Sequence, residues 1–227
     1  MNDLSQVPVS RGEYTEEELH QLTLKLSKLP YEELHTIRDI IGVAKHEDID
    51  VSALDPATIY RIELYMRHSV ISWKNLRFVV MDCPKDAAMD SYMQICMHYK
   101  VKNVVCLTQL QYSKKKFEDE DITINVWDFQ DGSPPPADVK KKWIKLVKDT
   151  FGPEAVDKSP TASLGVHCAA GLGRAPVLVA VALLEFGMDV YEAVELIRSK
   201  RRGAINQKQL QYLIKYEPQS DSSCTIS

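Results

Sequence analysis

The chain of 227 residues lacks the features that define several classes of protein. It contains no run of about 18 apolar residues, so we expect no membrane-spanning helix. The first 13 residues are polar and lack the apolar segment of a secretory signal. Because 32 acidic side chains outnumber 28 basic ones, the positive excess typical of nucleic-acid binders is missing, and we expect no nucleic acid among the partners.

Cysteine and histidine are sparse, and their spacing predicts neither a disulfide framework nor a metal site. The five cysteines are scattered, and no two form a C-x-x-C pair. Free thiols of this kind favour a reducing environment, so the predicted location is cytoplasmic. The six histidines have no ligand spacing with cysteines or carboxylates, so we expect no metal and no cofactor.

Charge and hydrophobic pattern divide the chain into two parts. Residues 1–72 carry 13 acidic and 7 basic side chains, whereas the remainder carries 19 acidic and 21 basic side chains. The first part has three segments with helical spacing of leucine and isoleucine, and Thr15 with Glu18 predicts a capping box. In the second part, short β-branched runs alternate with helical segments, which predicts an α/β sheet covered on both faces. The expected order is a flexible tail (1–13), a three-helix all-α unit (14–70, the last helix ending at 68), an α/β domain (73–216) and a disordered tail (217–227).

The most informative segment runs from His167 to Arg174. It follows an apolar run that predicts a buried strand, and it opens a strongly apolar segment that predicts a helix. Gly171 and Gly173 are expected to supply unusual backbone angles, which let N–H groups converge on an anion at the helix N-terminus. The predicted phosphate-binding loop comprises Cys168, Ala169, Ala170, Gly171, Leu172, Gly173 and Arg174.

The two ends of this loop carry the expected chemistry. Cysteines at helix N-termini are stabilised as thiolates, so Cys168 is predicted to be a nucleophile. The planar fork of Arg174 can bind two phosphoryl oxygens and stabilise charge in the transition state. Together they predict a phosphatase. The alternative is a buried structural cysteine beside a turn.

A phosphatase of this kind also needs an acid that protonates the leaving oxygen. The candidate is Asp131, which lies in a segment rich in proline and glycine at residues 127–136, after a predicted strand. The alternative is that Asp131 is only a turn residue, because Asp-Gly is a common turn pair.

Residues 75–216 resemble the type IVA protein tyrosine phosphatases, the phosphatases of regenerating liver. The resemblance rests on VHCAAGLGRAPVLVAVALLEFGM, EAVELIRSKRRGAINQKQLQYLIKY, the run NLRF at residues 75–78 and the acid loop. It implies a dual-specificity-type protein tyrosine phosphatase fold, with a central mixed sheet flanked by helices. It also implies that the substrate is a phosphorylated protein, and that Cys168 is the nucleophile, Arg174 the phosphate ligand and Asp131 the general acid.

The residue after the loop arginine is unusual among phosphatases in general. Most carry serine or threonine there, and the hydroxyl helps the thiolate to leave when the phosphocysteine is hydrolysed. Ala175 occupies this position, as in the type IVA family, so the resemblance implies slow turnover and a second role in binding cyclin-M-type magnesium transporters. Two hypotheses follow: a slow phosphatase, or an adaptor trapped as phosphocysteine. A rhodanese or arsenate reductase also has a cysteine loop with arginine, but the acid loop argues against both.

Two positions depart from the type IVA pattern. The family has a second cysteine that forms a reversible disulfide with the nucleophile, and the equivalent position holds Thr108. Cys106 lies two residues earlier, on the same face of a predicted strand, and is either the redox partner or a buried core cysteine. Gln130 stands where the family usually has another aspartate.

The last four residues begin with Cys224 and resemble a prenylation box whose terminal serine favours farnesyl. The type IVA family is also prenylated, but its basic stretch before the cysteine is missing here. A single lipid without a basic patch predicts weak, reversible association with the cytoplasmic face of membranes. The alternative is an unmodified tail.

Residues 14–68 resemble the NET (extraterminal) domain of bromodomain and extraterminal proteins, which has three helices. The resemblance rests on the run Tyr14-Thr15-Glu16-Glu17-Glu18 and on the segment from Ile49 to Leu64. It implies capture of a peptide with alternating lysine and apolar residues by an acidic strand. The predicted peptide-binding residues are Glu47, Asp48, Ile49 and Asp50. The alternative is an acidic, solvated loop between helices.

Overall fold

The computed structural model describes residues 13–29, 31–44 and 48–218, and it divides into the units Met1–Arg67 and His68–Ser227. Glu47 and Cys224 lie outside the described residues. Among the helices of the described part, none is long and apolar enough to cross a membrane.

The described residues of the first unit form helices around a small apolar core. The capping box predicted at Thr15 is present, because Glu18 N–H donates to the Thr15 hydroxyl and Thr15 N–H donates to the Glu18 carboxylate. The elements are α1 (Glu16–Leu26), α2 (Tyr31–Ile41), the 3-10 helix η1 (Val51–Ala53) and α3 (Pro56–Arg67). The buried core residues are Leu22, Leu26, Ile37, Val51, Ile59 and Ile62.

The second unit is built on a five-stranded sheet within residues 68–218, in the order β1-β2-β5-β3-β4. The strand β1 is antiparallel to β2, and the other neighbours are parallel. The strands are β1 (His68–Trp73), β2 (Leu76–Met81), β3 (Val101–Cys106), β4 (Thr123–Val126) and β5 (Ser163–His167). The helices are η2 (Asp86–Ala88), α4 (Met89–His98), α5 (Lys115–Asp119), α6 (Ala137–Phe151), α7 (Arg174–Glu185), α8 (Val190–Lys200) and α9 (Gln207–Ile214).

The strand β1 was not predicted, and neither was the short helix α5. The predicted third helix extends to His68 and the predicted α/β domain begins at residue 73, whereas β1 starts at His68. The strand was not predicted because it begins with the polar residues His68 and Ser69, and such residues are more often exposed than buried. In the structure both are buried. Pairing with β2 overrides that local preference, as tertiary contacts often do.

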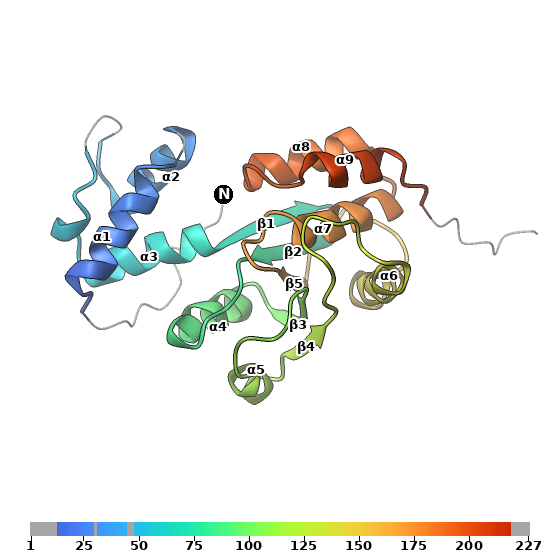
Figure 1. The fold of residues 1–227 in the computed structure, drawn as a ribbon, viewed down its shortest axis with the longest axis horizontal. Helices are drawn as coiled ribbons and strands as arrows, with labels where there is room; N and C mark the ends of the chain where they lie inside the picture. The colour runs from blue at the N-terminus through green and yellow to red at the C-terminus, as the bar shows by residue number, and fades with distance from the viewer. Residues whose placement is uncertain (1–12, 30, 45–47, 219–227) are drawn as a thin grey trace, which may run out of the picture. The chain divides into compact units, whose positions relative to one another are not determined.

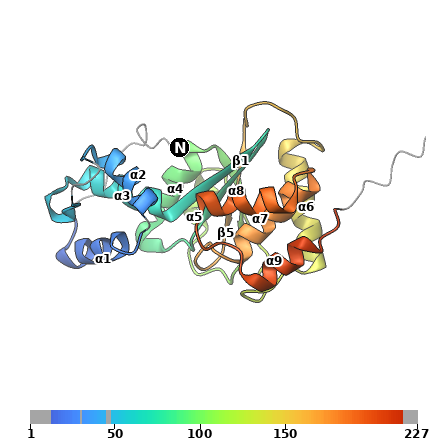
Figure 2. The ribbon, with the colours of Figure 1, turned by 90° about the horizontal axis from the view of Figure 1, so that it is seen from above.

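Alternate residues of the central strands point to opposite faces of the sheet. Phe78 of β2 packs on Trp143 of α6, and the Trp143 indole N–H donates to Leu178 O of α7 at 2.6 Å. Residues of the helices α6 to α9 and of one face of the sheet together form one apolar core. In Figure 1, α4 lies on the other side of the sheet, and Figure 2 shows α7 and α8 side by side.

The carboxyl ends of the four parallel strands lie at one edge of the sheet. The pairing register places Met81, His167, Cys106 and Val126 in one row across β2, β5, β3 and β4. The loops that leave this row therefore meet, and this edge is where open α/β sheets bind ligands.

Candidate active site

The predicted phosphate loop joins β5 to α7, and the carbonyl groups of residues 168–173 each accept a hydrogen bond. The donors to residues 169–172 come from segments far apart in the sequence, whereas Cys168 and Gly173 accept from residues close to them in the chain. The bonds are Leu107 N to His167 O (3.0 Å), His167 Nδ1 to Cys168 O (3.5 Å), Cys83 N to Ala169 O (2.9 Å), Arg201 Nη2 to Ala170 O (2.9 Å), Arg201 Nε to Gly171 O (2.7 Å), Ile205 N to Leu172 O (2.8 Å) and Val177 N to Gly173 O (3.1 Å).

Because the carbonyl groups turn outward, the N–H groups on the opposite side of each peptide plane turn inward. Within the described residues, the amides of residues 169–173 donate to no protein acceptor. The first turn of α7 adds its own free N–H groups, since the N-cap Gly173 offers no side-chain acceptor. This ring of donors at a helix N-terminus can hold an anion.

The loop needs glycine at one position for its backbone and at another for space. Gly171 has φ +70°, and a Cβ there would lie 2.6 Å from Met81 O, so only glycine fits. Gly173 was expected to need the same freedom, but its φ is −113°. A Cβ on Gly173 would instead lie 3.3 Å from Gln209 Nε2, so this position is limited by packing.

The Arg174 side chain is buried, and one of its nitrogens is fully engaged. Nη1 donates to Leu107 O and Phe129 O, both at 2.8 Å, and reaches Asp128 Oδ1 at 3.4 Å. Nε is buried and has no hydrogen-bond acceptor in the described structure. The guanidinium is thus anchored at one corner and leaves a donor available to an anion.

The acid loop brings Asp131 close to Arg174. Asp131 Oδ1 lies 3.2 Å from Arg174 Nε, but out of line with the N–H bond. Asp131 also stands in a turn, because Ser133 N–H donates to Gln130 O at 3.3 Å and Gly132 has φ +69°. The turn therefore presents the carboxylate to the loop arginine, while 74% of the Asp131 side chain remains exposed.

His167 is completely buried and forms part of a polar pair that the sequence analysis missed. The Tyr112 hydroxyl lies 2.8 Å from His167 Nε2, and His167 Nδ1 lies 3.5 Å from Cys168 O. A carbonyl only accepts, so Nδ1 carries the proton and Nε2 accepts from Tyr112. Burial lowers the pKa of His167 to about 4, the Cys168 carbonyl opposes this, and the charge of Arg174 lowers it further.

The low pKa of His167 predicts a pH-dependent stability. In the unfolded chain His167 becomes protonated below about pH 6.5, whereas in the folded chain it becomes protonated only near pH 4. The free energy of unfolding should therefore fall as the pH drops through this window, by as much as about 3 kcal/mol. Denaturant unfolding at pH 7, 5.5 and 4.5 measures it. The His167→Gln variant should show a weaker dependence of the free energy of unfolding on pH, and the variant of the exposed His98, His98→Gln, should not. An equal pH dependence in the wild type and both variants would contradict the low pKa of His167.

Two further cysteines, Cys106 and Cys83, lie on segments that pair with the loop or with the strand before it. Cys106 pairs in register with His167, is buried, and its thiol donates to Thr108 O at 3.2 Å. Cys83 follows β2 and is partly exposed. Burial raises the pKa of Cys83, and Cys106, Asp82 and Cys168 raise it further against a hydrogen bond with Thr108. A disulfide between Cys106 and Cys168 stays a prediction.

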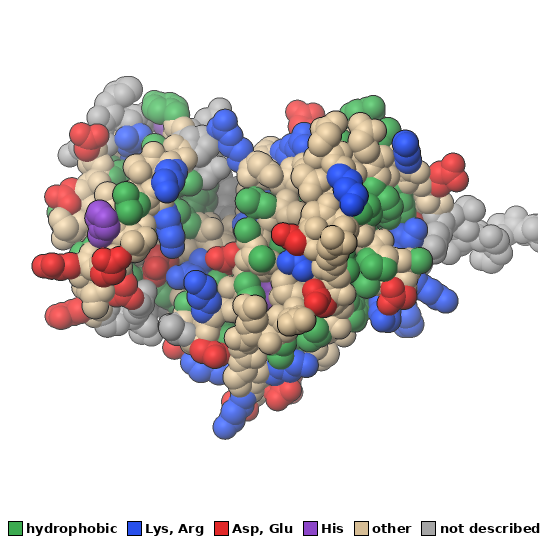
Figure 3. Space-filling view, viewed as in Figure 1, with side chains coloured by type: hydrophobic (Ala, Val, Ile, Leu, Met, Phe, Trp, Pro, Cys, Tyr) green, Lys and Arg blue, Asp and Glu red, His purple; other side chains and the backbone are tan. Residues whose placement is uncertain are grey.

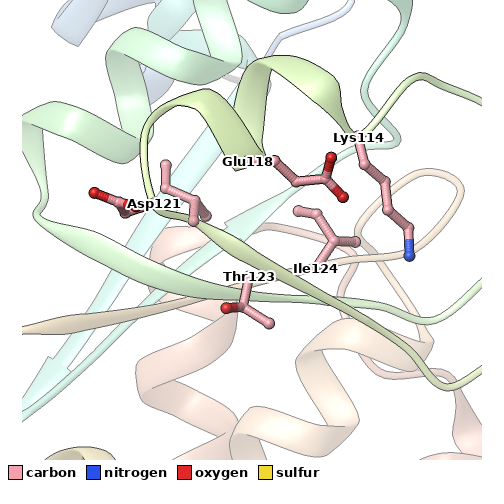
Figure 4. A pocket seen from close by; sticks show the side chains of 6 residues that line it. Lys114, Glu118, Asp121, Thr123 and Ile124 are labelled. Carbon is pink, nitrogen blue, oxygen red and sulfur yellow. The ribbon is translucent and has the colours of Figure 1, made fainter.

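A surface pocket lies at a different place, beside the edge strand β4. Its volume is about 390 Å³, and Figure 4 shows charged and apolar side chains around it. The lining residues are Lys114, Glu118, Asp121, Ile122, Thr123 and Ile124. On the molecular face in Figure 3, acidic and basic side chains are interspersed.

The acidic segment of the first unit is only partly described. Asp48 and Asp50 are exposed, whereas Ile49 packs against the apolar core. Asp50 caps η1 by accepting from Ser52 N–H and from the Ser52 hydroxyl, and these hydrogen bonds lower the pKa of its carboxyl group. The described residues 48–50 form no strand.

Comparisons with known proteins match the phosphatase part of the chain. A family model described as protein-tyrosine phosphatase matches residues 112–218. The protein tyrosine phosphatase type IVA 3 of Bos taurus is 45% identical over 148 residues, which cover 65% of this chain and 83% of that protein. The PRL-1 phosphatase of Drosophila melanogaster is 39% identical over 163 residues, which cover 72% and 90%. A solved protein tyrosine phosphatase from Leishmania major superposes with TM-score 0.58 at 34% identity, covering 67% of this chain and 99% of that one.

The mixed sheet and the cysteine–arginine loop at its carboxyl edge place the chain among the cysteine-dependent tyrosine and dual-specificity phosphatases. Within that class, it belongs to the type IVA family of protein tyrosine phosphatases. The predicted α/β phosphatase fold and the predicted enzyme class are confirmed. The adaptor alternative is not favoured by these relatives.

Proposed function

We propose that Cys168 is the nucleophile, Arg174 the phosphate ligand and Asp131 the general acid of this phosphatase. One observation carries the proposal: within the described residues the carbonyl groups of residues 168–173 are hydrogen-bonded, the amides of residues 169–173 have no acceptor, and Arg174 Nε faces Asp131 at 3.2 Å without a hydrogen bond. Such a set of amide donors beside a buried guanidinium matches the equatorial oxygens of a phosphoryl group.

The reaction then has two steps. The Cys168 thiolate attacks phosphorus, the bond from phosphorus to the substrate oxygen breaks, and the Asp131 carboxylic acid protonates that leaving oxygen. Water next attacks phosphorus and gives a proton to the Asp131 carboxylate, the phosphorus–sulfur bond breaks, the thiolate returns and phosphate leaves. Neutral, buried His167 donates to Cys168 O and keeps the backbone beside the nucleophile in place.

We propose that the second step is slow. Ala175 is completely buried at the start of α7, directly after Arg174, and brings no hydroxyl to assist the departing thiolate. Mixing the reduced protein with a chromogenic aryl phosphate should give a burst near one equivalent followed by slow turnover. Intact mass should detect the phosphate adduct. Ala175→Ser should raise the steady rate severalfold without changing the burst rate, whereas steady turnover without a burst would contradict slow hydrolysis.

A second proposal concerns the first unit, where exposure alternates along the acidic segment. Asp48 and Asp50 are exposed and Ile49 is half-buried, so the two carboxylates are accessible to a basic peptide, although residues 48–50 form no strand in the described structure. We propose that a peptide with alternating lysine and apolar residues binds there, as the NET resemblance implies. Calorimetric titration of the whole chain with such a peptide tests this, and an absence of saturable binding would remove it.

The remaining partners stay predictions that rest on the resemblance alone. The predicted partner is a cyclin-M-type magnesium transporter. The predicted modification is a lipid on Cys224, and the predicted localisation is cytoplasmic with weak association to membranes. Cys106 likewise stays the predicted redox partner of Cys168.

A further inference from the structure

The N-terminus of α9 is closed by a reciprocal pair of side chains. Gln209 N–H donates to Asn206 Oδ1 at 2.9 Å, and Asn206 N–H donates to Gln209 Oε1 at 3.1 Å, which completes a capping box. Each amide side chain thus uses its oxygen for the helix. The capping box leaves both side-chain NH2 groups free to bond elsewhere.

Both NH2 groups donate to the acid loop. Asn206 Nδ2 donates to Gly132 O at 3.2 Å, and Gln209 Nε2 donates to Ser133 O at 3.4 Å. These two carbonyl groups directly follow Asp131 in the chain. The segment between β4 and α6 has no helix or strand of its own, so these bonds are a main constraint on the turn that carries Asp131.

Gln209 also packs against the phosphate loop. Its side chain is completely buried, and a Cβ on Gly173 would lie 3.3 Å from Gln209 Nε2 and 3.8 Å from Asp131 Oδ1. A Cβ on Gly132 would lie 3.3 Å from Asn206 Nδ2. The glycines at these two positions therefore let the α9 cap reach both loops at once.

We propose that Asn206 and Gln209 are positioning residues that fix the acid loop over the phosphate loop. The carboxylate of Asp131 is mostly exposed, and its position depends on the turn behind it. The capping box sets that turn and thereby sets the distance from Asp131 to the leaving oxygen. The inference rests on the proposed role of Asp131 as general acid.

The test separates the helix cap from the contact with the acid loop. Serine caps helices as well as asparagine does but is too short to reach Gly132, so Asn206→Ser should keep the melting temperature. We expect it to slow phosphocysteine formation about fivefold with phenyl phosphate, the size of one lost hydrogen bond, and to leave dinitrophenyl phosphate unaffected. Exposed Gln207→Ala is the matched control and should leave both rates unchanged.

The variant Asp131→Ala and the double variant Asp131→Ala/Asn206→Ser complete a double-mutant cycle with Asn206→Ser. If Asn206 acts through Asp131, the double variant should be no slower than Asp131→Ala alone. Equal slowing of both substrates by Asn206→Ser, additive losses, or no loss would overturn the positioning role. If Asp131→Ala itself slows both substrates equally, the assignment of Asp131 as the acid fails, and this outcome is distinct from failure of the α9 contact.

Discussion

Replacing Cys168 by serine is expected to lower phosphatase activity by about 10⁴-fold or more, to the limit of detection. The serine hydroxyl has nearly the volume of the thiol but stays protonated in the same ring of amide donors, so no nucleophile forms. The burst with aryl phosphate and the phosphate adduct in the mass spectrum should both disappear. Phosphate or vanadate should still bind, because the loop amides and Arg174 remain.

Cys83→Ser is the matched control for this experiment. Cys83 lies beside the loop, but only its backbone N–H holds the loop, through Ala169 O. Its serine variant should retain activity within about twofold. Undiminished activity in Cys168→Ser would remove the phosphocysteine mechanism, and equal losses in both variants would point to damage of the loop instead.

Replacing Arg174 by lysine should have the second-largest effect. Lysine keeps the charge, but it lacks the planar fork that holds Leu107 O and Phe129 O with one nitrogen while another faces the anion. We expect kcat/KM for phenyl phosphate to fall by about 10²- to 10³-fold. Vanadate affinity, measured by competition, should weaken in parallel.

The control for this substitution is Arg77→Lys. Arg77 also holds a carbonyl with its guanidinium, Pro160 O at 3.2 Å, but it does so near the amino end of β5, away from the loop. It should alter stability without altering kcat/KM. A small effect of Arg174→Lys on catalysis, with normal melting temperature, would contradict its role as phosphate ligand.

The local parts of the site could be predicted because their signals are local. An apolar run, a cysteine, glycines and an apolar helix lie next to one another between residues 163 and 185, so periodicity and composition place them correctly. Asp131 could be proposed because its Asp-Gly turn also lies within one short segment. The family resemblance then narrowed the class of enzyme.

The parts that hold the site together could not be predicted in the same way. Tyr112, Arg201, Asn206 and Gln209 act on groups 30 to 76 positions away, through bonds that carry no local pattern. Arg201 lies within a basic triplet at the end of α8 and resembles an ordinary solvated charge. The strand β1 was missed for a similar reason, since only its pairing with β2 explains its buried polar residues.

The outward-facing carbonyl groups of the phosphate loop have a consequence for the order in which the protein loses structure. Their donors sit after β2, after β3 and, for Ala170, Gly171 and Leu172, on the segment that joins α8 to α9. The conformation of the loop therefore depends mainly on hydrogen bonds donated by other segments of the chain. The helix α9 is short and buries only Gln209 and Leu213, so we expect it to open locally at a lower cost than the central strands. Fraying of α9 would release Ile205 and Arg201 from the loop, and catalysis would cease at denaturant concentrations that leave the sheet intact.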